Sequence, residues 1–195
     1  MKIKSIETWS HKMKLAVPYT IAYETIDTTV NLFTRVTTNS GIVGFGCAAP
    51  DLEVTGETEE SVLKASNDFI EPLLKGSDPL RYSYQLNKLT EPLKNHPSSL
   101  AMIDMALYDI LGKKANLPIY KLLGGFREKI KTSITIGILP TKETVKHAKD
   151  FVRQGFSILK IKGGAYIDED IERMIIVREA VGKSILLRFD ANQGY

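Results

Sequence analysis

The sequence predicts an α+β domain followed by the opening βα units of a parallel α/β domain. Residues 1–47 have the pattern of strands, and apolar side chains then recur at helical spacing over residues 58–121. After residue 125 the pattern changes to strand, helix, strand, helix, strand, which is typical of parallel strands joined by helical crossovers. We therefore expect two domains, at residues 1–125 and 126–195.

Strands are expected first, at about residues 3–9, 29–37 and 42–47. The turn sequence Asn39-Ser40-Gly41 separates the last two strands and predicts a β-hairpin. The first domain therefore begins as a small sheet.

Helices follow, at about residues 61–74 and 79–89. A third helix is expected after Ser98-Ser99, because serine side chains cap helix N-termini well. Its core-facing positions recur at helical spacing, and they are Leu100, Ile103, Leu107 and Leu111.

The second domain alternates strictly between strands and helices. Strands are expected at residues 130–138, 157–162 and 184–190. Thr141 can cap one helix, and Gly155 suits its C-terminal end. A second helix is expected at residues 168–181, with inward-facing side chains at Ile171, Met174 and Ile175.

Composition is that of an ordinary globular protein: 195 residues, 43% hydrophobic, 25% charged, with a net charge of +3. Basic residues are scattered among acidic ones, so we expect neither a nucleic-acid nor a membrane partner. A single cysteine, Cys47, excludes an intrachain disulfide and fits a reducing compartment. We therefore expect a cytoplasmic protein.

Polar side chains gather where two neighbouring strands of the second domain end. Lys160 and Lys162 share one face of their strand, because side chains alternate along it. Asp190 and Asn192 follow the next strand and supply oxygen donors suited to a divalent cation. Two amines close together favour loss of a proton from one of them, as a base requires. The sequence thus predicts a proton-transfer site beside a metal.

Simpler explanations exist for each of these residues. A lone Lys-x-Lys is more often a solvated surface pair, and a lone Asp190 could be a turn or helix-capping residue. Here the apolar neighbours Leu159 and Ile161 indicate a buried strand, and the two motifs occur together. A Schiff-base aldolase would also place a lysine on a barrel strand, but it leaves Asp190 and Asn192 unexplained.

Three segments resemble the enolase superfamily. Residues 99–125 are SLAMIDMALYDILGKKANLPIYKLLGG, residues 159–164 are LKIKGG, and residues 187–195 are LRFDANQGY. The resemblance is to the muconate-lactonising-enzyme subgroup, and within it to the dipeptide epimerases of the L-Ala-D/L-Glu type. It implies an α+β capping domain followed by a (β/α) TIM-like barrel.

The resemblance also implies roles for the polar residues. Lys162 is implied as the catalytic acid and base, and Lys160 as a catalytic residue that also binds the substrate carboxylate. Asp190 is implied as the first ligand of a Mg²⁺ cofactor, with Asn192 next to this ligand rather than on the ion. Thr135 is implied to touch substrate.

The loop between the first two strands is implied to close over the site and to contact the far end of the substrate. This loop is expected at about residues 18–27, and aligning Pro18-Tyr19-Thr20 with it puts Glu24 at a position that touches the substrate side chain. An acid there would favour a cationic side chain over a glutamate.

The reaction implied is Mg²⁺-dependent epimerisation of a dipeptide, by removal and return of the proton alpha to a carboxylate through an enediolate. The substrate class is a small molecule, a dipeptide or an acylated amino acid, and a homo-oligomer is expected. Alternatives within the subgroup are an N-acylamino acid racemase, an o-succinylbenzoate synthase and a cycloisomerase. A non-catalytic truncated fragment is the alternative from outside the enzymes.

One departure from the family pattern is large. A (β/α) barrel needs roughly 250 residues, and residues 126–195 supply only its first strands. We therefore expect the barrel to be incomplete in this chain. The other two carboxylate ligands and an opposing lysine are expected beyond Tyr195.

Overall fold

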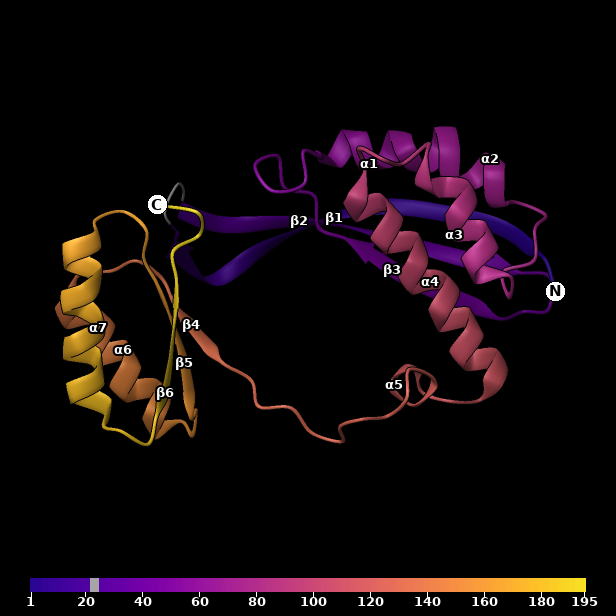
Figure 1. The fold of residues 1–195 in the computed structure, drawn as a ribbon. Helices are drawn as coiled ribbons and strands as arrows, with labels where there is room; N and C mark the ends of the chain where they lie inside the picture. The colour runs from indigo at the N-terminus through magenta and orange to yellow at the C-terminus, as the bar shows by residue number, and fades with distance from the viewer. Residues whose placement is uncertain (22–24) are drawn as a thin grey trace. The chain divides into compact units, whose positions relative to one another are not determined.

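The computed structural model describes residues 1–21 and 25–195, and it divides into two compact units (Figure 1). The first unit contains Met1–Met13 and Thr29–Phe126, and the second contains Lys14–Thr28 and Arg127–Tyr195. The division into domains at residues 1–125 and 126–195 stays a prediction. Contacts in the structure group the segment Lys14–Thr28 with the second unit.

A sheet of three strands, in the order β1-β2-β3, begins the chain. The strands are β1 (Ile3–Thr20), β2 (Thr25–Thr38) and β3 (Val43–Ala48). β2 and β3 pair antiparallel, with Phe33 opposite Cys47, which confirms the predicted hairpin. Part of the expected loop at residues 18–27 is strand, because β1 extends to Thr20 and β2 begins at Thr25, while residues 22–24 lie outside the described part of the chain. Turn composition alone did not indicate strands of this length.

Helices cover this sheet in the first unit (Figure 1). The longest, α4, lies against β3, and Gly46 permits the close approach because a Cβ there would lie 1.8 Å from the Met102 carbonyl oxygen. Leu32 and Val36 of the sheet share one buried core with Ile103 and Leu107 of α4. The helical segments are α1 (Glu59–Ala65), the π-helical η1 (Ser66–Ile70), α2 (Glu71–Leu74), α3 (Tyr82–Thr90), α4 (Pro97–Ala115) and α5 (Ile119–Leu122).

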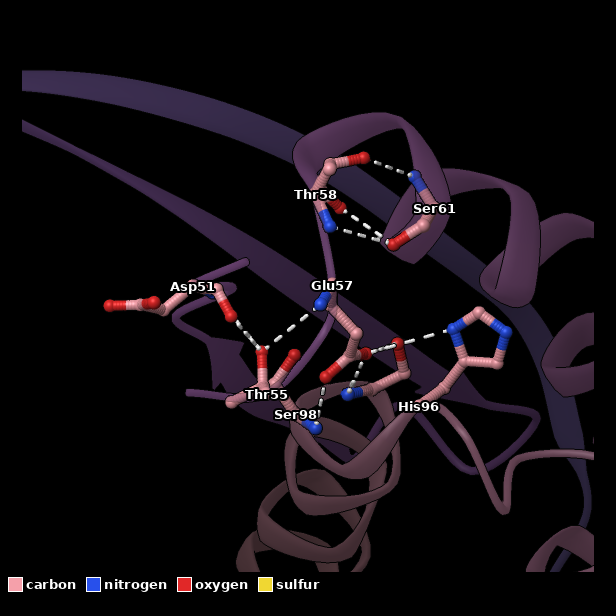
Figure 2. Close-up of polar contacts among 8 residues, drawn as sticks. Asp51, Thr55, Glu57, Thr58, Ser61, His96 and Ser98 are labelled. Atoms are coloured by element: carbon pink, nitrogen blue, oxygen red, sulfur yellow. Dashed lines mark hydrogen bonds and ion pairs between the residues drawn. The ribbon is translucent and has the colours of Figure 1, made fainter. Parts of the chain in front are cut away.

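The start of α4 is capped from outside the helix, by Glu57. This side chain is buried, and its carboxylate accepts hydrogen bonds from the Ser98 backbone N (2.7 Å) and the Ser99 backbone N (3.2 Å). Figure 2 shows the carboxylate facing this first turn, with His96 Nδ1 3.8 Å from its Oε1. The prediction that Ser98-Ser99 caps the helix was wrong, because both serines lie inside the first turn and a distant carboxylate binds their free N–H groups.

Replacing Glu57 by glutamine should lower the free energy of unfolding by about 2 kcal/mol. Glutamine keeps the size of the side chain but offers one acceptor oxygen to three donors, counting Ser99 Oγ at 2.8 Å. Urea unfolding of parent and variant measures the change. Glu53→Gln is the matched control, since Glu53 is exposed in the same loop and should change stability by less than about 0.5 kcal/mol. Equal losses in both variants would contradict the cap.

The second unit contains a parallel sheet in the order β4-β5-β6. Its core joins Ile136, Leu159 and Ile161 of the sheet to Ala148 and Val177 of the helices. This arrangement confirms the predicted opening βα units. The elements are β4 (Ile134–Ile136), α6 (Thr141–Arg153), β5 (Ile158–Lys162), α7 (Ile167–Val181) and β6 (Leu186–Asp190).

Three predictions for this unit need correction. Thr141 does not cap α6, because it is the first residue of the helix and Pro140 occupies the cap position. β4 is shorter than residues 130–138, because it pairs with β5 only from Ile134 to Ile136. The inward face of α7 was also wrong in part: Met174 packs on the core, but Ile171 and Ile175 are more than half exposed. Asp170 and Arg173 are buried on this helix instead, and an ion pair between them makes that burial possible.

No helix in the described part of the chain combines the length and apolar character needed to cross a bilayer.

Candidate active site

Polar side chains meet at the carboxyl ends of β5 and β6, within the second unit. The parallel register places Lys162 beside Asp190, and Lys160 beside Arg188, on the same face of the sheet. Asp190 Oδ2 lies 2.6 Å from Lys160 Nζ and 2.9 Å from Lys162 Nζ. The structure therefore brings together the two motifs that the sequence singled out.

Asn192 completes this cluster from the turn after β6. Its backbone N donates to Asp190 Oδ1 (3.0 Å), and its amide Oδ1 accepts a hydrogen bond from Lys162 Nζ. Asn192 has a φ of 47° and Gln193 a φ of 59°, so the turn is left-handed where asparagine is better tolerated than most residues. This turn brings the Asn192 side chain back toward β5.

The charge of Asp190 is stabilised by its neighbours. The hydrogen bond from Lys160, and then those from Lys162 and the Asn192 backbone, hold the pKa of Asp190 well below its usual range. The Lys162 side chain is only 10% exposed, whereas that of Lys160 is 34% exposed. The neighbouring amines therefore favour the carboxylate form of Asp190, and Lys162 is the more enclosed of the two amines.

A cavity of about 820 Å³ adjoins the lysines in the second unit. Lys160, Lys162 and Thr135 supply polar groups to its wall, and most of the rest of the wall is apolar. Val17 and Pro18 of β1 also line it, and the nearby Thr20 carbonyl oxygen accepts a hydrogen bond from Ile138 N (2.8 Å). An apolar cavity with a few convergent polar groups is typical of a small-molecule site.

The structure therefore places most, but not all, of the predicted site residues. Thr135 lies directly beside Lys160 in the register of β4 and β5, so both face the cavity. Glu24 lies outside the described residues. Arg188 lies opposite Lys160 in the register of β5 and β6 and is exposed, and sequence reasoning did not single it out.

The donor atoms near Asp190 suit a hard cation such as Mg²⁺, which prefers carboxylate and other oxygen ligands. Within residues 1–21 and 25–195, no group of three or more His, Cys, Asp or Glu side chains could hold a metal ion. Asp190 offers one carboxylate to such an ion, and the Asn192 backbone N–H holds this carboxylate with a hydrogen bond of 3.0 Å.

Comparison with known families identifies this arrangement. The mandelate racemase/muconate lactonizing enzyme N-terminal domain matches residues 3–124, and the enolase C-terminal domain-like family matches residues 143–195. The chain belongs to the mandelate racemase/muconate lactonizing enzyme family. This confirms the resemblance to the enolase superfamily, and the second unit is the start of its barrel domain.

Similar curated proteins are epimerases. The chain is 44% identical over 195 residues to an L-Lys-D/L-Arg epimerase of Desulforapulum autotrophicum, and 36% identical over 196 residues to an L-Ala-D/L-Glu epimerase of Bacillus subtilis. Both matches cover 100% of this chain, but only 55% and 54% of the relatives. The chain thus spans about half the length of the curated relatives it matches.

Solved structures of epimerases are also similar to this chain. A substrate-liganded L-Ala-D/L-Glu epimerase from Bacillus subtilis superposes with a TM-score of 0.96 at 36% identity. A dipeptide epimerase from Enterococcus faecalis, complexed with Mg and the dipeptide L-Leu-L-Tyr, also has a TM-score of 0.96, at 37% identity. Each match covers 100% of this chain and 55% of the other chain.

Proposed function

We propose that the whole protein carrying this chain is a Mg²⁺-dependent dipeptide epimerase, which removes and returns the proton on the carbon next to a carboxylate. The observation that carries this proposal is the meeting of Lys160, Lys162 and Asp190 at the ends of β5 and β6, beside an apolar cavity. The epimerase names of its relatives, and the Mg and dipeptide in the Enterococcus faecalis structure, support it.

Lys162 is proposed as the acid and base. Its Nζ is held by Asp190 and Asn192 on the cavity side of β5, so it has a fixed position from which to take a substrate proton and return it. Lys160 is proposed to bind the substrate carboxylate, since its more exposed amine faces the same cavity. Thr135 lies beside Lys160 and offers a hydroxyl for a further hydrogen bond to substrate.

Asp190 is proposed to hold the Mg²⁺ ion together with ligands from the rest of the whole protein. When bound, this ion neutralises negative charge that develops on the substrate carboxylate as the proton leaves. The low pKa of Asp190 keeps the ligand ionised without any need for the metal. Asn192 is proposed to orient Asp190 and Lys162 rather than to bind the ion.

Racemisation of an N-acylated amino acid is the second candidate. It requires the same proton transfer, and the chain is 31% identical to an N-succinyl-L-Arg/Lys racemase of Bacillus cereus. As parts of the main proposal, we expect a homo-oligomer that is cytoplasmic and has no nucleic-acid or membrane partner. The single cysteine supports the compartment, and the net charge of +3 supports the lack of such partners.

A substrate panel in D₂O tests both the reaction and its specificity. The whole protein with Mg²⁺ should add one deuterium to dipeptides of the L-Ala-L-X series, and a chelator should stop the gain in mass. We expect apolar or basic residues at X to react at least as well as L-Ala-L-Glu, because Glu24 would repel a second carboxylate. N-succinyl amino acids in the same panel would favour the second candidate if only they react.

The variant Glu24→Arg tests whether this residue selects the substrate. It should lower kcat/KM for L-Ala-L-Lys relative to L-Ala-L-Glu by roughly tenfold, because it replaces an attraction with a repulsion, each worth up to about 1 kcal/mol. Glu179→Arg makes the same charge change at an exposed position near the end of α7 and should leave the ratio unchanged. Strong preference for Glu in the parent, with no change in Glu24→Arg, would show that Glu24 is not the selector.

A further inference from the structure

Asp170, in the first turn of α7, has a buried carboxylate that the proposed reaction does not use. It is 4% exposed, and its side chain accepts hydrogen bonds from the segment after β5, from the turn after β6 and from α7 itself. Oδ2 accepts hydrogen bonds from the Gly164 backbone N (2.7 Å) and from the Tyr195 hydroxyl (2.8 Å). Oδ1 accepts from Arg173 Nη1, so the buried charge is paired.

These partners lie just after the two strands of the site. Gly164 follows Lys162 by two residues, and Tyr195 ends the turn that begins after Asp190. One carboxylate therefore binds the segment after β5 and the segment after β6 at the same time. A backbone hydrogen bond from Gly163 N to the Asp190 carbonyl oxygen (3.1 Å) also joins the two strand ends.

Close packing shows that the junction has no spare room. A Cβ on Gly163 would lie 2.5 Å from Asp170 Oδ2 and 2.5 Å from the Phe189 ring. A Cβ on Gly194 would lie 2.1 Å from the Gly164 carbonyl oxygen. Glycines thus let the two segments and the carboxylate approach within hydrogen-bonding distance, and a shift of Asp170 must move the ends of both strands.

We propose that Asp170 is a positioning residue that ties the ends of β5 and β6 together and so holds Lys162 in place for proton transfer. The inference rests on the proposed function, in which Lys162 is the base. Lys162 reaches Asp190 and Asn192 only while these strand ends stay in register. Proton transfer is sensitive to such placement, since a shift of about 1 Å can cost about 100-fold in rate.

The test measures α-proton exchange in D₂O with retention of configuration, separately for the two epimers of one dipeptide, in the whole protein. Each epimer presents its proton to a different face, and the resemblance implies an opposing lysine for the second face. Lys162→Ala identifies the epimer that Lys162 deprotonates, because exchange of that epimer is lost. A fold defect would slow both epimers, whereas displacement of Lys162 slows one.

In Asp170→Asn, we expect kcat for the epimer deprotonated by Lys162 to fall about tenfold to 100-fold, with its KM within about threefold of the parent value. Exchange of the other epimer should fall by less than about threefold. Tyr195→Phe removes one bond to Asp170 from an exposed ring and should show the same selectivity: exchange of the epimer deprotonated by Lys162 should fall about threefold relative to exchange of the other epimer, measured in the same sample. It decides the question alone if Asp170→Asn does not fold.

Glu169→Gln is the matched control. It removes the same charge from the same turn of α7, but its carboxylate is exposed and 4.0 Å from Arg173, so both epimers should exchange as in the parent. Equal slowing of both epimers, or no slowing, in the Asp170 and Tyr195 variants would overturn the inference while leaving the proposed function intact. Unchanged exchange in Lys162→Ala would instead overturn the proposed function.

Discussion

Lys162→Ala in the whole protein should lower epimerisation by about 1,000-fold or more and abolish α-proton exchange of one epimer. The variant removes the amine that is proposed to take the proton. Two other ionisable side chains line the cavity: Lys160, which is proposed to bind the carboxylate, and His147 of α6. Mass shift in D₂O measures the exchange, and optical rotation measures the epimerisation. A rate near that of the parent would show that Lys162 is not the base.

Two further variants separate this role from general effects of charge. Lys160→Ala should lose much of the activity and raise KM, because Lys160 is proposed to bind the substrate carboxylate. Lys183→Ala removes an exposed amine from the turn before β6 and should leave the rate unchanged. If Lys160→Ala loses as much activity as Lys162→Ala and its KM is unchanged, the two lysines have the opposite of the proposed roles.

Asp190→Asn should weaken Mg²⁺ binding and catalysis together. Changes to residues that merely orient a ligand already cost up to about 100-fold in metal affinity, so loss of a charged ligand should cost at least that much. Calorimetric titration with Mg²⁺ and the Mg²⁺ dependence of kcat give the two measurements. Asp168→Asn, an exposed acid in the first turn of α7, is the control and should change neither.

The outcome also tests a competing role for Asp190. Its Oδ2 pairs with both Lys160 and Lys162, so the carboxylate could serve only as their counter-ion. In that case Asp190→Asn would lower activity while Mg²⁺ affinity stayed as in the parent. If Mg²⁺ affinity and activity fall together in Asp190→Asn, the result supports Asp190 as a ligand of the ion.

Local patterns in the sequence were enough for the parallel strands and for the polar residues at their ends. β5 and β6 are apolar runs that end in polar side chains, and alternation puts Lys160 and Lys162 on one face whatever surrounds them. Parallel strands carry their carboxyl ends to one edge, so the proximity of Lys162 and Asp190 followed from the order of elements.

Local patterns could not predict contacts between segments that are far apart in the sequence. Glu57 caps α4 although it lies 41 residues upstream of Ser98, and the sequence near that helix does not indicate this cap. β1 continues to Thr20, and α7 buries Asp170 while the expected core residues Ile171 and Ile175 are exposed. Hydrophobic periodicity does not detect a buried carboxylate, because its cost is offset by partners that only the folded chain supplies.

The sequence by itself determined the family, the order of the elements and the identity of the lysine and aspartate motifs, since each depends on residue type and short-range spacing. The tertiary structure alone decided that Asp190 lies between both amines, that Val17 and Pro18 line the cavity, and that Asp170 joins the two strand ends. These features need atoms placed to within a few tenths of an ångström, and that precision comes only from packing segments far apart in the chain.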